Sequence, residues 1–118
     1  MVGEKIIFHI CRTNEWQAAI VAGSYEGSSQ DVADGFIHFS TADQLSKSAS
    51  IHRRGQQGLV LLSVDSGLLG ESLKWEKSRG GNLFPHLYGQ LPLTAVIRVD
   101  ELAIGSEGLH VFPEELGI

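Results

Sequence analysis

The run Leu59-Val60-Leu61-Leu62-Ser63-Val64 limits the folds open to this chain more than any other segment. An extended backbone with apolar side chains on both faces is typical of a strand in the centre of a sheet. Such a strand needs neighbours along both edges and a covering layer over each face. A chain of 118 residues with 42% hydrophobic content has room for one such core. The sequence therefore predicts one domain, residues 1–118, built around this strand.

Two helices are predicted before the central strand. The first covers Asn14–Ala22, with Thr13 as its N-cap. The second begins with Thr41-Ala42-Asp43-Gln44, which is typical of a capping box, and continues to about His52. Between the two helices, Ser24–Asp34 is polar and contains glycine, which indicates a surface loop and a candidate lid over a ligand.

Most of the remaining strands are predicted in the second half of the chain. Before the central strand, Ile6–Cys11 alternates as a strand buried on both faces, and Gly35–Ser40 is a second, short strand. Phe84–Tyr88 fits either a strand or an ordered loop. The other predicted strands are Leu73–Glu76, Ala95–Val99, and a terminal hairpin that pairs Ala103-Ile104 with Leu109–Phe112. Six or seven strands with two helices indicate an α+β fold.

The distribution of charge argues against nucleic acid as a dedicated partner. Nine basic and fourteen acidic residues give a net charge of −5, and no basic stripe is present that could follow a phosphate backbone. The one basic cluster is His52-Arg53-Arg54, with Lys47 before it. We expect this cluster to complement the dipole of the second helix and to remain solvated.

Two further features bear on where the protein works. Ile6–Arg12 is too short an apolar run for a membrane span or a signal peptide, which predicts a soluble, cytoplasmic protein without a membrane partner. Cys11 is the single cysteine, so neither an internal disulfide nor a Cys-x-x-Cys motif is possible. Its apolar surroundings indicate an unreactive thiol. The sequence does not indicate an oligomeric state.

Polar side chains on apolar strands are the strongest sign of a functional site. In the extended segment Gly35–Thr41, Phe36, His38 and Ser40 point to one side of the strand. His9 and His86 also lie on or beside apolar strands. A buried imidazole needs a hydrogen-bond partner, so each histidine either bonds to a backbone carbonyl in the core or belongs to a site.

A metal site is one alternative for the three histidines. His9, His38 and His86 could together bind zinc, with one coordination position open for water. Their spacings match no ligand signature, so a histidine-based metal-dependent hydrolase is an alternative hypothesis and not the leading one. Ser40 lies about 7 Å along the strand from His38, which is awkward for direct activation as a nucleophile. We therefore expect Ser40 to bind a ligand or to cap the next helix.

Other side chains could recognise or transform a ligand. Glu76 ends a short strand, where a carboxylate can act as a general base or stabilise a developing positive charge; an ordinary solvated acid is the alternative. Tyr88 and Phe84, with Tyr25 or Trp16, offer aromatic surfaces for a nicotinamide or a nucleobase, although core packing explains Trp16 and Phe84 equally well. The chain contains no Gly-x-Gly-x-x-Gly and no P-loop motif, which argues against a Rossmann or P-loop site.

Two longer motifs carry a resemblance to a known family. Gly35-Phe36-Ile37-His38-Phe39-Ser40 and Phe84-Pro85-His86-Leu87-Tyr88-Gly89, with Phe8-His9 before them and Trp75-Glu76 between them, resemble small, mostly bacterial single-domain proteins of unknown function. The resemblance covers about Ile6 to Val99. That family is similar in fold to the ADP-ribosyltransferase superfamily, whose site is a cleft in a split mixed sheet that grips NAD. The first motif also resembles the His-x-His-x-Ser segment of the tRNA 2′-phosphotransferases, which use NAD to remove a phosphate.

This resemblance implies a cleft that binds NAD or an ADP-ribose-like nucleotide, with transferase or phosphotransferase activity as a hypothesis. By position, His9 corresponds to the group that holds the adenine-side ribose, His38 with Ser40 to the groups near nicotinamide, and Glu76 or His86 to the group that stabilises the oxocarbenium. The arginines of the chain do not match the arginine set of the phosphotransferases, so a non-catalytic nucleotide-binding module is a further alternative. The predicted catalytic residues are His9, His38, Glu76 and His86, and the predicted cofactor-binding residues are His9, His38, Ser40, Thr41, Tyr88 and Gly89.

Overall fold

The first sheet contains the predicted central strand. The computed structural model describes residues 6–118. The strand order in this sheet is β1 (Ile6–Arg12), β4 (Leu59–Asp65), β8 (Val96–Ile104) and β9 (His110–Val111). All neighbouring strands are antiparallel, and β4 lies between β1 and β8 with six of its seven residues buried. The apolar run at 59–64 is therefore a central strand, as predicted.

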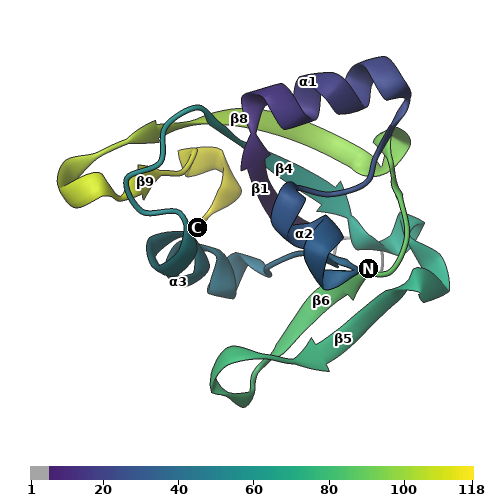
Figure 1. Ribbon diagram of the computed structural model, residues 1–118. Helices are drawn as coiled ribbons and strands as arrows, with labels where there is room; N and C mark the ends of the chain where they lie inside the picture. The colour runs from purple at the N-terminus through teal and green to yellow at the C-terminus, as the bar shows by residue number, and fades with distance from the viewer. Residues whose placement is uncertain (1–5) are drawn as a thin grey trace.

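Helices cover both faces of this sheet (Figure 1). On one face, Val60, Leu62 and Val64 of β4 share a hydrophobic cluster with Ala19 of α1 (Thr13–Ala22). On the other face, Leu61 packs in a cluster with Leu45 of α3 (Ala42–His52). Alternate residues of one strand thus face two different helices, which explains why the strand is apolar on both sides.

A second sheet diverges from the first and holds the two longer sequence motifs (Figure 1). Its strand order is β3 (Ile37–His38), β6 (Leu83–Leu87) and β5 (Leu73–Lys77), all antiparallel. A single β-bridge between Phe8 and Ser40 connects β1 of the first sheet to the segment after β3. A small third ladder pairs β2 (Ser24–Tyr25) with β7 (Leu91–Pro92).

The segment predicted as a polar lid is ordered and partly buried, so that prediction was wrong. It forms β2 and the short helix α2 (Ser29–Asp34). Ser28 caps this helix, its hydroxyl accepting from the Asp31 N–H while its own N–H donates to the Asp31 carboxylate. Gly35 then ends the helix with a φ of 88°, a left-handed conformation that favours glycine. Tyr25 and Asp31 are both buried, which a mobile lid would not allow.

Capping hydrogen bonds determine where the helices begin. The capping box of Thr41 and Gln44 begins α3 as predicted, and α3 ends at His52. The first helix begins one residue earlier than predicted, because Arg12 is its N-cap and donates its N–H to the Glu15 side chain. Thr13 instead donates its hydroxyl to the carbonyl of Gly58, which ties the start of α1 to the start of β4.

The described residues confirm an α+β fold, with nine strands and three α-helices rather than six or seven and two. Phe84–Tyr88 is largely strand, and the strand predicted at Ala95–Val99 extends to Ile104. The terminal hairpin is present as the pairs Ala103 with Val111 and Ile104 with His110. None of the helices in this part of the chain has the length and hydropathy needed to cross a bilayer. Short 3-10 turns occur at Ser66–Leu68, Gly70–Ser72, Arg79–Gly81, Leu93–Ala95, Ser106–Gly108 and Glu114–Leu116.

Candidate functional site

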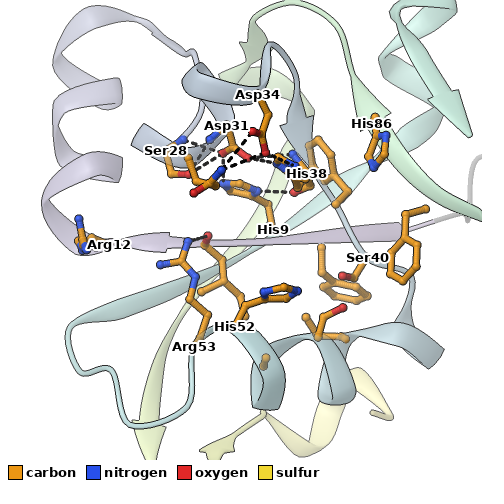
Figure 2. A pocket seen from close by; sticks show the side chains of 18 of the residues that line it. His9, Arg12, Ser28, Asp31, Asp34, His38, Ser40, His52, Arg53 and His86 are labelled. Carbon is orange, nitrogen blue, oxygen red and sulfur yellow. Dashed lines mark hydrogen bonds and ion pairs between the residues drawn. The ribbon is translucent and has the colours of Figure 1, made fainter. Parts of the chain in front are cut away.

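A cavity of about 620 Å³ lies beside β1, where the two sheets separate. Its walls come from β1, α2, β3, α3 and β6. Figure 2 shows His9, Asp31 and His38 on one side of the cavity, with His52 and Arg53 of the α3 end facing them from the other side. Segments that are far apart in sequence therefore meet around one hollow.

Asp31 is the best-connected polar group in this cavity wall. One carboxylate oxygen accepts hydrogen bonds from the N–H and the hydroxyl of Ser28, at 2.7 and 2.9 Å. The other accepts from the backbone N–H of His38 at 3.0 Å and from its Nδ1 at 2.5 Å. Burial alone would raise the pKa of Asp31, but the hydrogen bonds from His38 and Ser28 lower it to about 2. Asp31 is therefore a buried carboxylate that remains ionised.

His38 lies between two carboxylates. Its Nδ1 bonds to Asp31, and its Nε2 lies 3.0 Å from Oδ2 of Asp34. An imidazole can donate from both nitrogens only when it is protonated. The hydrogen bond to Asp31 raises the pKa of His38 above its ordinary value, against the partial burial of the ring, and the charges of Asp31 and Asp34 act in the same direction. The structure thus favours the imidazolium form of His38.

His9 is held in the opposite state. Its Nδ1–H donates to the backbone carbonyl of His38 at 2.6 Å, because a carbonyl can only accept. Its Nε2 lies 2.7 Å from the hydroxyl of Tyr25, which donates to it. Burial lowers the pKa of His9 although the charge of Asp31 acts to raise it. His9 is therefore a neutral imidazole whose two nitrogens are both used inside the protein.

We expect the imidazole of His38 to titrate with a pKa above 6.5, because two carboxylates stabilise its charged form. The substitution Asp34→Asn should lower this pKa, while Asp31 keeps it from falling to the value of a free histidine. Proton NMR titration of the histidine ring resonances measures both values. Asp43→Asn, at the exposed start of α3, is the matched control and should leave the titration of His38 unchanged. A His38 pKa at or below 6.5 in the unmodified protein would contradict the geometry.

A second histidine–carboxylate pair borders the cavity. Nδ1 of His86 donates to Oε1 of Glu76 at 2.7 Å, and the hydroxyl of Tyr88 donates to the same oxygen at 2.7 Å. The bond from His86, followed by the bond from Tyr88, lowers the pKa of Glu76. His86 is 6% exposed and lines the cavity, whereas Glu76 is at the outer rim. Glu76 was predicted as a general base or a stabiliser of positive charge, with an ordinary solvated acid as the alternative. The register of β5 with β6 pairs Glu76 with Phe84, which makes His86 its diagonal neighbour on the same face.

Phe36 connects the two histidine–carboxylate pairs. Its ring stacks on His86 with centroids 4.2 Å apart and lies 4.5 Å from the ring of His38. The ring centroid of Tyr88 lies 5.2 Å from that of Phe36, so Tyr88 belongs to the same aromatic cluster. Sequence reasoning placed Phe36 on the correct strand face but gave it no role. The structure shows that it fixes the rings of both histidines.

The opposite wall of the cavity carries positive charge. Arg53 extends from the end of α3 to β1, where it donates to the carbonyl of Ile10 at 3.1 Å, and it also donates to the side chain of Gln56. Arg12 and His52 line the same cavity. The expectation that the whole His52-Arg53-Arg54 cluster is solvated was therefore wrong for Arg53, whose side chain is half-buried and packed across the cavity floor.

The structure brings half of the predicted site residues to the cavity. His9, His38, Ser40 and His86 line it, and the Ser40 hydroxyl has no hydrogen bond to another residue within 6–118. Thr41 instead faces a smaller hollow next to Trp75. Glu76, Tyr88 and Gly89 do not line the cavity, although Glu76 is hydrogen-bonded to His86, which does.

Several aromatic and sulfur-bearing residues belong to the core. Tyr25 is buried and packs against Trp16 at a centroid distance of 6.2 Å, so neither offers a free face to a ligand. Phe84 is also buried. Cys11 is fully buried, and this burial raises the pKa of its thiol to about 11, which confirms the prediction of an unreactive cysteine.

The geometry does not fit a three-histidine metal centre. A metal ligand needs a free nitrogen lone pair. His9 uses both nitrogens, and His38 directs both at carboxylates, which leaves only His86 with a nitrogen that has no partner among residues 6–118. Over the same residues, no group of three or more His, Cys, Asp and Glu side chains is arranged to hold a metal ion. The arrangement of these residues therefore argues against the metal-hydrolase alternative.

Asp31 is the main site residue that sequence reasoning missed. The signal was present, because Ser28-Ser29-Gln30-Asp31 has the spacing of a capping box and Gly35 follows at the distance of a short helix end. Arg12 and Arg53 were also missed, and no local pattern marks them as cavity residues.

Together, the fold and the site define a small α+β domain with a pocket of histidines and carboxylates where two sheets diverge. Residues 10–99 match the model of the family described as "Protein of unknown function (DUF952)", and the chain belongs to this family. No curated protein matches the chain.

Solved structures of protein CC0527 from Caulobacter crescentus share this fold. The crystal structure is 44% identical, with a TM-score of 0.91, and the match covers 96% of this chain and 99% of that one. A double mutant of the same protein gives 43% identity and a TM-score of 0.91 over the same shares of the two chains. The solution NMR structure of CC0527 is 47% identical, with a TM-score of 0.79, over 88% of this chain and 90% of that one.

Proposed function

We propose that the cavity binds a nucleotide of the NAD or ADP-ribose type and that the protein acts as a transferase of the ADP-ribosyltransferase type. The observation that carries this proposal is the position and lining of the cavity. It lies at a split between two sheets, with His9 on the first strand and His38 and Ser40 on the strand opposite it. The sequence resemblance to the ADP-ribosyltransferase superfamily supports the same assignment.

The chemistry of the cavity walls fits the parts of such a nucleotide. A diphosphate needs cationic donors, which Arg12 and Arg53 offer from one wall. Ribose hydroxyls need acceptors and small donors, which the Asp34 carboxylate and the Ser40 hydroxyl offer among the lining residues. A volume of about 620 Å³ is within the range of cofactor sites. Bound NAD would supply an ADP-ribosyl group, with the bond to nicotinamide as the one that breaks.

The geometry also assigns roles to the histidines. His9 is 4% exposed and spends both nitrogens on protein groups, so we assign it to holding the backbone of His38 rather than to direct contact with ribose. His38 contributes a positive charge at the cavity wall, with both of its N–H groups directed at Asp31 and Asp34.

Isothermal titration calorimetry with ADP-ribose and NAD⁺ tests the proposal. The unmodified protein should bind both ligands, and Arg53→Ala should weaken binding about tenfold or more, because a hydrogen bond to a charged group contributes about 1.5–3 kcal/mol. Arg54→Ala is the matched control: the neighbouring arginine interacts with Glu107 and does not line the cavity, so its loss should not change the affinity.

Two results would count against this function. An absence of binding heat and of any thermal shift with NAD⁺ and ADP-ribose at millimolar concentration would exclude a nucleotide site. Equal weakening by Arg53→Ala and Arg54→Ala would show only a general effect of charge. Because Arg53 also donates to Ile10, the melting temperature of each variant must be measured alongside.

A further inference from the structure

Two histidines face each other across β3 and β6 in different hydrogen-bonded states. His38 and His86 are directly paired in the antiparallel register, so their side chains share one face of the sheet. Their ring centroids are 5.6 Å apart. Both nitrogens of His38 interact with carboxylates, whereas His86 has a partner among residues 6–118 on Nδ1 alone.

The free nitrogen of His86 is held in a fixed orientation. Nδ1–H donates to Glu76, which leaves the lone pair on Nε2 for the neutral ring, and Nε2 has no hydrogen bond to another residue within 6–118. The ring also stacks on Phe36, with planes 29° apart. A hydrogen bond at one nitrogen and a stacked neighbour together fix the ring, which lines the cavity. This is the arrangement of a general base oriented by a carboxylate.

We propose that His86 is the general base that activates a hydroxyl group, of water or of an alcohol, as the acceptor of the transferred group, and that Glu76 is its positioning residue. This inference rests on the proposed nucleotide site. It adds the chemical class of the acceptor, a hydroxyl group, and names His86 as the residue that activates it.

The carboxylates of the site point to an O–H acceptor rather than a cationic one. A guanidinium or ammonium acceptor would need a carboxylate free to face it. Asp31 already accepts four hydrogen bonds. Asp34 contacts His38 and Gln30, and Glu15 accepts from the backbone N–H of Arg12. Glu76 accepts two hydrogen bonds on one oxygen and lies outside the cavity. A hydroxyl, in contrast, must lose its proton as it attacks, and a positioned neutral imidazole accepts that proton.

The step balances without any further reactant. The acceptor oxygen forms a bond to the anomeric carbon of the ribose, and the bond between that carbon and the nicotinamide nitrogen breaks. The electron pair of the broken bond leaves with nicotinamide, which becomes neutral. The acceptor proton moves to Nε2 of His86, and the negative charge of Glu76 stabilises the imidazolium that results.

Nitrogen NMR of the free protein tests the arrangement without turnover. We expect neutral His86 to show a protonated Nδ1 and an unprotonated Nε2, and Glu76→Ala to shift the Nδ1–H signal and mix the two tautomers. Glu71→Ala, an exposed acid in the turn before β5, is the matched control and should leave these signals unchanged. A proton on Nε2 in the unmodified protein would overturn the proposal.

Release of nicotinamide from NAD⁺, with water or methanol as the acceptor, tests the role in catalysis. His86→Asn should reduce kcat by about 10²- to 10⁴-fold. Glu76→Gln should reduce kcat with little change in the KM for NAD⁺, because Glu76 does not line the cavity. Glu71→Gln should match the unmodified protein.

The outcomes separate this inference from the proposed function. Binding of ADP-ribose by calorimetry together with an unchanged kcat in His86→Asn, or with no nicotinamide release at all, overturns the general base and leaves nucleotide binding in place. Failure of NAD⁺ and ADP-ribose to bind overturns the proposed function and this inference with it. If kcat falls in both His86→Asn and Glu76→Gln, and neutral His86 carries its proton on Nδ1 in the free protein, the results support both the proposed function and this inference.

Discussion

Replacing Asp31 by asparagine should lower the free energy of unfolding by about 3 kcal/mol, because it leaves hydrogen-bond donors around a buried carboxylate without an acceptor. The side chain is buried, and its two oxygens accept four hydrogen bonds from Ser28 and His38. An amide has one oxygen, so its NH₂ group would face two donors that no longer have an acceptor. For a chain of 118 residues this loss corresponds to a melting temperature about 12 °C lower. Thermal unfolding followed by circular dichroism measures it.

The pH dependence of stability provides a more specific test of the substitution Asp31→Asn. Because the pKa of Asp31 is lowered to about 2 in the folded state, its contribution is complete above about pH 4 and is lost as the pH falls toward 2. In Asp31→Asn, this loss of stability at low pH should be absent. His9, with its pKa lowered by burial, adds a loss of stability as the pH falls below 6.5. His38, with its pKa raised, adds a loss as the pH rises above 6.5.

Stability should therefore fall on the acid side through Asp31 and His9 and on the alkaline side through His38. Asp43→Asn is the control for loss of a surface carboxylate, and we expect it to change stability by less than about 1 kcal/mol. If both substitutions had the same small effect, the network around Asp31 would not be a stabilising feature of the fold.

Gly27→Ala should also destabilise the protein by about 3 kcal/mol, and it acts on the same carboxylate from the backbone side. Gly27 has a φ of +105°, which strains any residue with a side chain. A Cβ at this position would lie 2.6 Å from Cβ of Asp31 and 3.2 Å from Cγ1 of Ile37. Since Asp31 is fixed by its hydrogen bonds, the new methyl group must displace it. Chemical denaturation gives the stability, and the ring resonances of His38 report the displacement.

Gly35→Ala separates the effect of backbone strain from the effect of the steric contact with Asp31. Gly35 has a φ of +88°, but a Cβ there would meet no atom within 4 Å. Its substitution should therefore cost only the backbone strain, about 1 kcal/mol, and should leave the environment of His38 less disturbed. Equal losses of stability at Gly27 and Gly35 would mean that the close approach to Asp31 has no energetic effect.

Local sequence signals predicted the elements that depend on local chemistry. The capping box at Thr41 and the apolar run at 59–64 both gave the correct element, because caps and burial patterns act over a few residues. The helix α2 was missed since it has only six residues and no apolar periodicity, although Ser28 and Asp31 carried its capping signal. The two-residue strand β2 was missed because its partner, β7, is far away in the sequence.

The candidate site was predicted only as a set of residue types. His9, His38 and His86 were identified because a polar side chain on an apolar strand is unusual. Their different hydrogen-bonded states were not predictable, since these depend on which groups the fold brings near each ring. Glu76 meets His86 through the register of β5 with β6, and Arg53 reaches β1 across the cavity; both contacts are long-range.

Within residues 6–118, the two sheets meet at a short seam. It consists of the reciprocal backbone hydrogen bonds of Phe8 and Ser40 and the bond from His9 to the carbonyl of His38. Because the two sheets are joined only along part of one edge, a change in the angle between them would alter the backbone mainly at that edge. All four of these residues also line the cavity. We therefore expect a ligand that widens the angle between the two sheets also to change the orientation of the His9 and His38 rings.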